Sequence, residues 1–581
     1  LAAGEFELAE SWRIDGAALP VQVVRWTISG AAVGTRLTGA RSLATLDARV
    51  ESSANGTVDI DLPAQWRARL AQPRSHSSDD AAWPSLFDSQ GALRLARWPR
   101  EGWALFTGPA GDENTIRAEN EAPLAEWRDE TSAWTLGFFK YPWHADYLRL
   151  VASDDLQRTL RLSGQGRTGI GPAGRYRVLN LRSALRASGE YWFDAARGRL
   201  IARPHEGSSH GTLRLTVLTE PLLHLRNVQA FEIMDLTFAA TRGHAVVVEN
   251  SSDIVLSRLM IRDIGRSGVV ADGGRDVRIR GSSIVDVGQH AVLLRGGDRA
   301  QLRRAGHHIE NSRISRPSQR LDTPASAIRL EGVGQVVRGN TIEDAPHSAV
   351  YYEGNDHLIE ANWIGRVCLD VSDAGAIYAG RDWTARGTVI RRNVFTHLQP
   401  AIAGGMVTAI YLDDMMSGTR IENNAIVDAQ YGVLVGGGRD NIVTKNLFLS
   451  THTPLHVDER ALTWAHRAVA PGEVMDKRLN AMPVRDATWA AAYPLLASMR
   501  RDRAPMPEGN QIRSNVVSES GAPSLVPMAV STGIIEAPVE LTVPKSVRTA
   551  EALLDFCIAN KSCMPFDPAG VPARPVRHDD R

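Results

Sequence analysis

The segment HAVVVENSSDIVLSRLMIRDIGRSGVVADGGRDVRIRGSSIVDVGQHAVLL, residues 244–294, contains the pattern that decides the fold. Short apolar runs begin in it at His244, Ser267 and His290, 23 residues apart. Further runs begin, after steps of 36, 22, 27, 33 and 23 residues, at Ser326, Ser348, Gly375, Thr408 and Tyr431. A step near 23 residues with occasional insertions is typical of a solenoid, in which each repeat packs on its neighbours.

A second run follows each copy, as in DIVLSRLMI from Asp253 and DNIVTKNLF from Asp440. Apolar and polar residues alternate in these runs, as in a strand with one buried face. Asparagines that precede the last apolar residues can stack into a hydrogen-bonded ladder; they are Asn340, Asn362, Asn393, Asn424, Asn446 and Asn515. The runs are short, β-branched and bounded by Gly, Asn and Asp, which argues against helices. We therefore predict an all-β fold, a right-handed parallel β-helix.

The remaining segments suggest how the chain is organised. Residues 1–8, LAAGEFEL, resemble a cloning scar, because adjacent restriction sites encode Glu-Phe and Glu-Leu, and a native signal peptide is then expected to have been cut away. Residues 9–60 and 171–518 are assigned to the β-helix, and the Trp-rich residues 61–170 to an inserted antiparallel β domain. Within the helix, residues 459–507 are predicted to form a helical or loop excursion. The Pro-rich residues 519–581 are predicted to form a tail that caps an exposed end.

Composition excludes several classes of protein. The 581 residues include 66 basic and 66 acidic side chains, so binding of nucleic acid by bulk charge is not expected. No apolar run is long enough for a membrane span, and no hydrophobic outer stripe suggests a trimeric spike, so we expect a monomer or dimer. Cys557 and Cys563 either pair in an oxidising compartment or remain two separate thiols. We expect a secreted or periplasmic protein.

The coils at residues 347–458 carry the candidate site. Equivalent positions of a β-helix stack about 4.8 Å apart, so Tyr351, Tyr378 and Tyr411 are expected in one outward column that suits a linear polymer. Candidate catalytic carboxylates near this column are Glu353, Asp373, Asp382, Asp413 and Asp414. Candidate substrate-binding residues are His347, Tyr351, Tyr378, Arg381, Trp383, Tyr411, Arg439 and His456. Rings stack on sugars, Arg and His bind hydroxyl or acid groups, and two carboxylates supply an acid and a base or nucleophile.

Two carboxylate spacings follow from the repeat. Asp382 and Asp414, in adjacent coils, would lie about 5–6 Å apart, as in retaining glycosidases. Glu353 and Asp413, two coils apart, would lie about 9–10 Å apart, near the inverting range. Each aspartate has an equally good structural role, because Asp at strand ends caps turns by accepting local amide hydrogen bonds.

The segments DAGAIYAGRDWTARGTVIRRNVF (373–395), AIYLDDMMSGTRIENN (409–424) and GVLVGGGRDNIVTKNLF (432–448) resemble glycoside hydrolase family 141. So do LARWPREGW (95–103), FFKYPWHADY (138–147) and SGEYWFDAARGRLIARP (188–204). The resemblance implies α-L-fucosidase or xylanase activity on plant polysaccharides, with Asp373 and Asp414 as the catalytic carboxylates. A straight coil would separate them by about 26 Å, so this assignment requires a sharp bend before Gly375. We rank this pair ahead of Asp382 and Asp413.

The sequence therefore predicts a glycoside hydrolase that cleaves a polysaccharide or oligosaccharide with two carboxylates and no cofactor. A polysaccharide lyase or epimerase on the same scaffold is the first alternative. The one lysine within the repeat, Lys445, lies off the candidate column, so the base would be His347, His397, Tyr378 or Tyr411. Ca²⁺ bound by the acidic residues would accompany this alternative. A carbohydrate-binding β-helix without catalysis is the second alternative.

Overall fold

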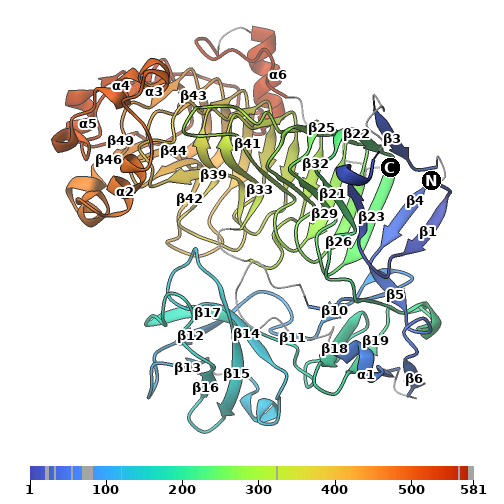
Figure 1. The fold of residues 1–581 in the computed structure, drawn as a ribbon. Helices are drawn as coiled ribbons and strands as arrows, with labels where there is room; N and C mark the ends of the chain where they lie inside the picture. The colour runs from blue at the N-terminus through green and yellow to red at the C-terminus, as the bar shows by residue number, and fades with distance from the viewer. Residues whose placement is uncertain are drawn as a thin grey trace.

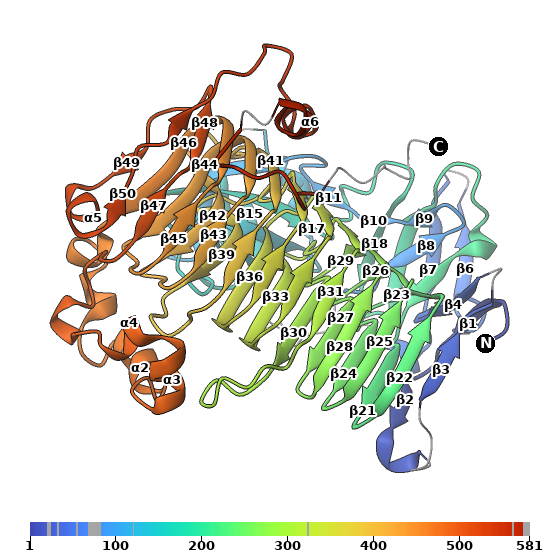
Figure 2. The ribbon, with the colours of Figure 1, turned by 90° about the horizontal axis from the view of Figure 1, so that it is seen from above.

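The computed structural model describes residues 1–19, 25–31, 34–53, 56–67, 83–119, 121–321, 325–560 and 563–572. Its main body is a parallel β-helix, in which strands of successive coils pair side by side along three ladders (Figure 1). Two ladders form one 23-stranded sheet, because β44 and β46 continue from one ladder into the other, and the third ladder is a 12-stranded sheet. Figure 2 shows the stack from β1–β4 at one end to β46–β50 at the other. The predicted parallel β-helix is thus confirmed.

The strands divide among the ladders as follows. The first ladder consists of β1 (Gly4–Glu7), β4 (Thr35–Thr38), β23 (Leu236–Thr241), β26 (Met260–Ile264), β29 (Ser283–Val287), β32 (Arg313–Ser315), β35 (Thr341–Glu343), β38 (Trp363–Gly365), β41 (Val394–Leu398), β44 (Ala425–Gly436), β46 (Leu447–Asp458), β48 (Val516–Ser518) and β51 (Val539–Glu540). The second consists of β2 (Trp12–Asp15), β21 (Leu223–Arg226), β24 (Val246–Glu249), β27 (Val269–Asp272), β30 (Val292–Gly296), β33 (Ser326–Val333), β36 (Ser348–Asn355), β39 (Ala374–Gly380), β42 (Val407–Asp413), the later parts of β44 and β46, and β49 (Ser524–Leu525). The third consists of β3 (Trp26–Ser29), β22 (Gln229–Met234), β25 (Ser252–Ser257), β28 (Arg275–Arg280), β31 (His308–Glu310), β34 (Val336–Arg338), β37 (Leu358–Glu360), β40 (Val389–Arg391), β43 (Arg420–Glu422), β45 (Ile442–Thr444), β47 (Gln511–Arg513) and β50 (Ile534–Ile535).

The core of the β-helix is a set of apolar columns. Val292, Ile328 and Val350 lie opposite one another in successive coils of the second ladder, and each is fully buried. Their neighbours along the strand point outward, since side chains of a strand alternate between its faces. The alternation read from the sequence therefore separates the packed interior from the outward column that carries the candidate site.

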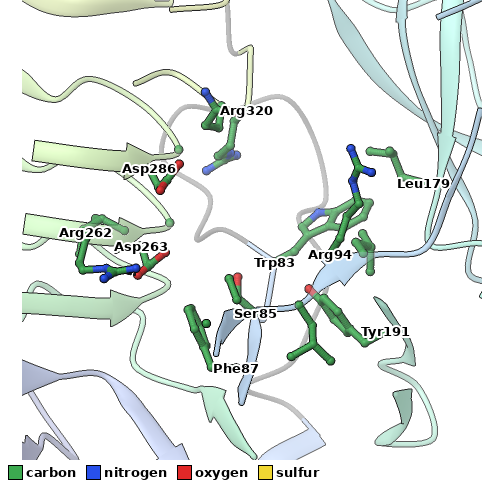
Figure 3. A pocket seen from close by; sticks show the side chains of 18 of the residues that line it. Trp83, Ser85, Phe87, Arg94, Leu179, Tyr191, Arg262, Asp263, Asp286 and Arg320 are labelled. Atoms are coloured by element: carbon green, nitrogen blue, oxygen red, sulfur yellow. Dashed lines mark hydrogen bonds and ion pairs between the residues drawn. The ribbon is translucent and has the colours of Figure 1, made fainter. Parts of the chain in front are cut away.

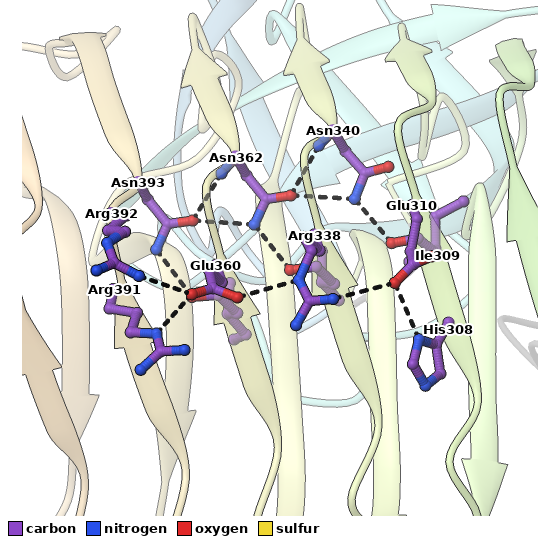
Figure 4. A network of polar contacts seen from close by, with 12 residues as sticks. His308, Ile309, Glu310, Arg338, Asn340, Glu360, Asn362, Arg391, Arg392 and Asn393 are labelled. Carbon is purple, nitrogen blue, oxygen red and sulfur yellow. Dashed lines mark hydrogen bonds and ion pairs between the residues drawn. The ribbon is translucent and has the colours of Figure 1, made fainter. Parts of the chain in front are cut away.

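The predicted asparagine ladder is present and buried (Figure 4). The amide of Asn340 donates to the side-chain oxygen of Asn362 at 3.0 Å, and Asn362 donates in the same way to Asn393 at 2.9 Å. The chain of bonds continues through Asn424, Asn446 and Asn515. Each side chain also binds backbone groups at the corner of the coil, so these buried polar groups are satisfied where the chain turns.

An antiparallel region interrupts the β-helix after β4. It contains a closed six-stranded barrel, formed by β12 (Ala104–Thr107), β13 (Thr115–Ala118), β14 (Trp134–Phe138), β15 (Asp146–Asp154), β16 (Thr159–Leu162) and β17 (Ala173–Leu179). Strand β11 (Arg97–Trp98) pairs with β17 at its edge. The barrel has its own core, which includes Phe106, Trp127 and Tyr176. The inserted β domain predicted from the sequence is therefore present.

Two small, mostly antiparallel sheets lie beside the barrel and move the predicted boundaries of the insertion outward. They are formed by β6 (Arg49–Ser52), β7 (Val58–Asp61), β10 (Arg94–Leu95), β18 (Glu190–Asp194) and β19 (Arg199–Arg203), and by β5 (Ala40–Ser42), β8 (Leu86–Asp88), β9 (Gly91–Ala92) and β20 (Arg214–Thr216). Both sheets are antiparallel except for the parallel pair β10–β18. The antiparallel region thus extends from β5 to β20 rather than over 61–170. The border strands β5 and β20 are three residues long, too short for hydropathy alone to distinguish them from coil strands. Residues 4–7, set aside as part of a cloning scar, form β1 and pair with β4.

Short helices occur in the insertion, in the excursion and in the C-terminal part. They are α1 (Ala64–Arg67), α2 (Val474–Asn480), α3 (Ala487–Ala492), α4 (Pro494–Ala497), α5 (Pro527–Thr532) and α6 (Ala550–Asn560). Helices α2–α4 lie between β46 and β47, within the predicted excursion, and α6 packs against β41 and β44. Cys557 and Cys563 form a disulfide, and Cys368 is buried and unpaired. Among the described residues, no helix has the length and hydropathy needed to cross a membrane.

Candidate functional site

The predicted tyrosine column is present on the outward face of the second ladder. Tyr351 lies opposite Tyr378, and Tyr378 lies opposite Tyr411, on β36, β39 and β42. The rings of Tyr351 and Tyr378 stack at 5.5 Å, whereas Tyr411 meets Tyr378 edge-on at 5.5 Å. The turned ring of Tyr411 aims its hydroxyl group away from the column and toward Asp373.

Arg460 organises the carboxylates at the ends of these strands. Its guanidinium group contacts Asp413, lies 3.2 Å from Asp414 and donates to Asp458 at 2.7 Å. Gly436 makes this arrangement possible, because a Cβ atom at that position would overlap the guanidinium carbon of Arg460. We call the group formed by Asp373, Asp413, Asp414, Asp458, Arg381 and Arg460 the carboxylate–arginine cluster.

Asp413 and Asp414 follow one another but have different partners. Asp413 accepts a 2.6 Å hydrogen bond from the hydroxyl group of Tyr378 in the preceding coil. Asp414 accepts a 2.6 Å hydrogen bond from Nε of Arg381, which lies in the same preceding coil. Both aspartates are buried, at 8% and 4% exposure, while Arg381 is exposed. The two carboxylates are therefore held in place by the neighbouring coil and by Arg460.

A sharp bend in the coil brings Asp373 to this cluster. A Cβ atom on Gly375 would lie 2.6 Å from Cβ of Tyr411 and 2.8 Å from the carbonyl oxygen of Ile377, which shows how tightly the backbone folds here. The hydroxyl group of Tyr411 donates to Oδ1 of Asp373 at 3.2 Å. The chain thus bends at Gly375 rather than before it, and Asp373 is exposed whereas Asp413 and Asp414 are buried.

The inserted barrel holds the loop that carries Asp373. Nε1 of Trp103 donates to the side chain of Asp370 at 2.8 Å, and Arg175 donates to the carbonyl oxygen of the same residue. The amide of Ser372 donates to the carbonyl oxygen of Pro142 at 3.0 Å. Segments far apart in the sequence thus fix the backbone just before the exposed carboxylate of Asp373.

The carboxylates of the cluster have pKa values that are shifted in different directions by their surroundings. Burial raises the pKa of Asp413, and the neighbouring charge of Asp414 raises it further. Desolvation by neighbouring side chains also raises the pKa of Asp373, and the charge of Asp414 acts in the same direction. Burial alone would raise the pKa of Asp458, but hydrogen bonds from His456 and Arg460 lower it to about 2. Groups with separated pKa values are what acid–base chemistry requires.

Two predicted site residues do not join the cluster. Asp382 caps its own turn by accepting hydrogen bonds from the amide and hydroxyl groups of Thr384, and it pairs with Arg299 at 3.3 Å. The expected pairing of Asp382 with Asp414 is therefore wrong, because Arg381 lies opposite Asp414 instead. Trp383 is buried among the apolar side chains of the excursion and is not available to a ligand.

Two further predicted residues have structural partners. His347 is buried, and burial lowers its pKa to about 4, so it is a neutral group of the interior. Arg439 lies 3.4 Å from both Asp440 and Glu508 and links the last coils to the excursion. Among the described residues, no hydrogen bond or ion pair joins His347 or Arg439 to the carboxylate–arginine cluster.

The last predicted residues border the cluster. Glu353 accepts a 2.8 Å hydrogen bond from the hydroxyl group of Tyr351 and lies 3.5 Å from Arg329. His456 lies 3.5 Å from Asp458, and its ring meets that of Tyr431 edge-on. Both are half-buried. They flank the cluster along the outward column.

Sequence reasoning missed Asp458 and Arg460. Asp458 lies opposite Gly436 and is the last residue of β46. The repeat register alone, extended from Asp413 through Gly436, leads to Asp458, so the sequence does carry a signal for this residue. Arg460 follows β46 in the short helical turn η5 (Arg460–Leu462) and carries no repeat signal.

A cavity of about 690 Å³ between the insertion and the coils is the other candidate (Figure 3). Trp83 and Tyr191 line it from the insertion, and Asp263 and Asp286 from the coils (Figure 3). Each of these aspartates already pairs with an arginine. Since Asp263 and Asp286 each form a simple ion pair with an arginine, the carboxylate–arginine cluster is the better candidate for a catalytic site.

The fold and the site together define a right-handed parallel β-helix protein with a cluster of acids on one outward face. Residues 244–448 match the family described as right handed beta helix region. A solved structure described as a glycoside hydrolase is similar at 14% identity, with 77% of this chain and 88% of that chain covered and a TM-score of 0.62.

Two further solved structures are less similar. The complex of XylC with xylose has 9% identity, coverage of 90% and 78%, and a TM-score of 0.44. A mannuronic acid specific polysaccharide family 6 lyase from human gut microbiota has 13% identity, coverage of 54% and 70%, and a TM-score of 0.36. No curated protein matches the chain.

Proposed function

We propose that the protein is a glycoside hydrolase that cleaves a polysaccharide or oligosaccharide with Asp373 and Asp414. The observation that carries this proposal is the bend at Gly375, which brings the exposed carboxylate of Asp373 to the hydroxyl group of Tyr411, beside Arg460 and Asp414. Two carboxylates in different environments are the machinery of glycoside hydrolysis.

The environments suggest the role of each group. Asp373 is exposed and its pKa is raised by desolvation, so it suits the acid that protonates the leaving oxygen. Asp414 is oriented by two guanidinium groups, which suits the carboxylate that attacks the anomeric carbon or activates water. Arg460 and Tyr411 hold the two acids in a fixed relation, and Arg381 covers Asp414 at the surface.

The fold adds support of a general kind. Stacked coils present a straight outward column, which suits a linear carbohydrate chain, and the structure at a TM-score of 0.62 is described as a glycoside hydrolase. The α-L-fucosidase or xylanase activity that the resemblance to family 141 implies is the finer form of the same proposal. Arginine partners occupy oxygens of Asp414 and Asp458 that a Ca²⁺ ion would need, so we propose a reaction without a metal ion.

The lyase or epimerase alternative is less well supported. It requires a base for the C5 proton of a uronic acid. Burial and the charge of Asp413 raise the pKa of Tyr378 and Tyr411, and His347 lies in the interior. The fourth candidate base, His397, lies on β41 in the first ladder rather than in the ladder that carries the cluster. The four candidates are therefore poorly suited or poorly placed for proton abstraction at the cluster, which favours hydrolysis.

The decisive experiment is a screen of aryl-glycosides and plant and bacterial polysaccharides, repeated with Asp373→Asn and Asp414→Asn. Each substitution is expected to lower kcat by about 10²–10⁴-fold, the usual contribution of an acid–base group. Asp382→Asn, which changes a turn cap and an ion pair with Arg299 outside the cluster, serves as the control and is expected to retain activity. Full activity in both cluster variants would rule out the assignment, and a product absorbing near 235 nm would instead indicate a lyase.

We also propose a secreted or periplasmic location. The disulfide between Cys557 and Cys563 requires an oxidising compartment. Mass spectrometry of protein from cell fractions, with and without reduction, tests both the bond and the location.

A further inference from the structure

The loop between β14 and β15 presents a stacked aromatic pair beside the cluster. The rings of Tyr141 and Trp143 are 5.2 Å apart and nearly parallel, at 10°. Tyr141 is 39% exposed, although it belongs to a barrel with a well-packed core. The residue between them, Pro142, accepts the hydrogen bond from Ser372. The loop that carries the aromatic pair is therefore bonded to Ser372, the residue before Asp373.

The excursion presents a second exposed ring beside the cluster. Trp464 is 69% exposed, and the guanidinium carbon of Arg460 lies 5.3 Å from its ring centre. Arg460 is the residue that joins Asp413, Asp414 and Asp458. The ring of Trp464 is therefore held against the centre of the cluster while most of its surface faces solvent.

The two aromatic groups lie at opposite ends of the adjacent parallel strands β39 and β42. Ser372, which binds the barrel loop, precedes β39, whereas Asp413, which binds Arg460, is the last residue of β42. Both groups belong to segments outside the coils. The tyrosines of the column lie between them; Tyr351 and Tyr378 are half-buried and Tyr411 is buried. Two exposed aromatic groups at opposite ends of the strands are farther apart than a single sugar unit would span.

We propose that Tyr141 with Trp143 and Trp464 are two sugar-binding platforms that hold a carbohydrate chain across the carboxylate–arginine cluster. This inference rests on the proposed function for the identity of the ligand. The C–H groups on one face of a pyranose ring form an apolar surface that packs on an aromatic ring through dispersion and loss of hydration. A chain bound at both platforms places an internal glycosidic bond at the cluster, so the ligand class is an oligosaccharide of several units.

The test measures binding in the Asp373→Asn background, so that turnover does not consume the ligand. The probes are a glycan array and, by calorimetry, xylohexaose, cellohexaose and hexagalacturonate, each compared with its monosaccharide. Tyr141→Ala and Trp464→Ala are each expected to weaken hexasaccharide binding about tenfold, and the corresponding Phe variants to retain it within about threefold. Leu156→Ala and Leu495→Ala change exposed side chains of the same two segments and serve as controls.

Each outcome decides the proposal. Hexasaccharide affinity within twofold of the parent in both alanine variants would overturn it, as would absence of binding to every glycan on the array. A changed sedimentation coefficient without loss of glycan affinity would identify Trp464 as a subunit contact and also overturn it. Glycan binding that depends on the platforms in a protein without hydrolase activity would uphold the platforms and reject the proposed hydrolysis.

Discussion

Gly436 determines where Arg460 lies. It occupies the column position next to Asp458, and the guanidinium group fills the space that a side chain would take. Gly436→Ala is expected to displace Arg460 and lower kcat/KM at least tenfold, because Asp413 and Asp414 lose their shared partner. Gly164→Ala is the control, since a Cβ atom there meets nothing within 4 Å. Equal activity of the two variants, measured beside their circular dichroism spectra, would contradict this account.

The raised pKa of Asp373 predicts the alkaline limb of the pH–rate profile. A general acid must be protonated, so activity is expected to fall as pH rises through this pKa. The positive charge of Arg381 lowers the pKa of Asp373, whereas the negative charge of Asp414 raises it. Arg381→Gln is therefore expected to move the alkaline limb to higher pH.

The measurement is the pH dependence of kcat/KM for both proteins on one substrate. Arg420→Gln, at an exposed position of the third ladder, is the control and should leave the limb unchanged. A limb that moves to lower pH in Arg381→Gln would show that Asp373 is not the acid.

At the scale of the element, the asparagine ladder stabilises the corners of the coils. Asn393 accepts hydrogen bonds from the backbone and side chain of Asn362 and donates to Asn424 and to the carbonyl oxygen of Ile359. Asn393→Ala leaves several of these buried groups without partners, at about 1–3 kcal/mol each. We expect a loss of about 3 kcal/mol or more, seen as a lower melting temperature.

The control for the ladder is Arg420→Ala, which removes one surface ion pair and is expected to change stability by less than about 1 kcal/mol. Similar melting temperatures for the two variants would show that the ladder contributes no more than the surface does.

At the scale of the whole molecule, the inserted barrel positions a loop of the β-helix. Trp103 binds Asp370 from the barrel, three residues before Asp373. Trp103→Phe keeps an aromatic ring but removes the N–H donor, so the loop loses one anchor while both cores remain packed. We expect kcat to fall about tenfold with little change in melting temperature, and amide exchange at residues 369–373 to become faster.

The matched control is Trp98→Phe, which changes a ring of the barrel that contacts Trp127 and Tyr176 rather than the loop. Unchanged amide exchange at residues 369–373 in Trp103→Phe would show that the barrel does not position Asp373.

The sequence predicted the local and repetitive features of the molecule. The 23-residue step, the alternation of apolar residues and the recurring asparagines were sufficient to predict the coils, the ladder and the register of Tyr351, Tyr378 and Tyr411. These features depend on interactions between neighbouring coils, and the repeat encodes such interactions directly.

Only the tertiary structure decided which acids meet. The bend at Gly375, the one-residue offset that replaces Asp382 by Arg381, and the arrival of Arg460 depend on contacts between distant segments. Composition and spacing therefore determined a stack of coils with an acidic outward face. The arrangement of the site was set by the bend of the backbone at Gly375, by the inserted barrel and by the excursion. The insertion and the excursion follow no repeat, because packing against distant segments, rather than periodicity, determines where they lie.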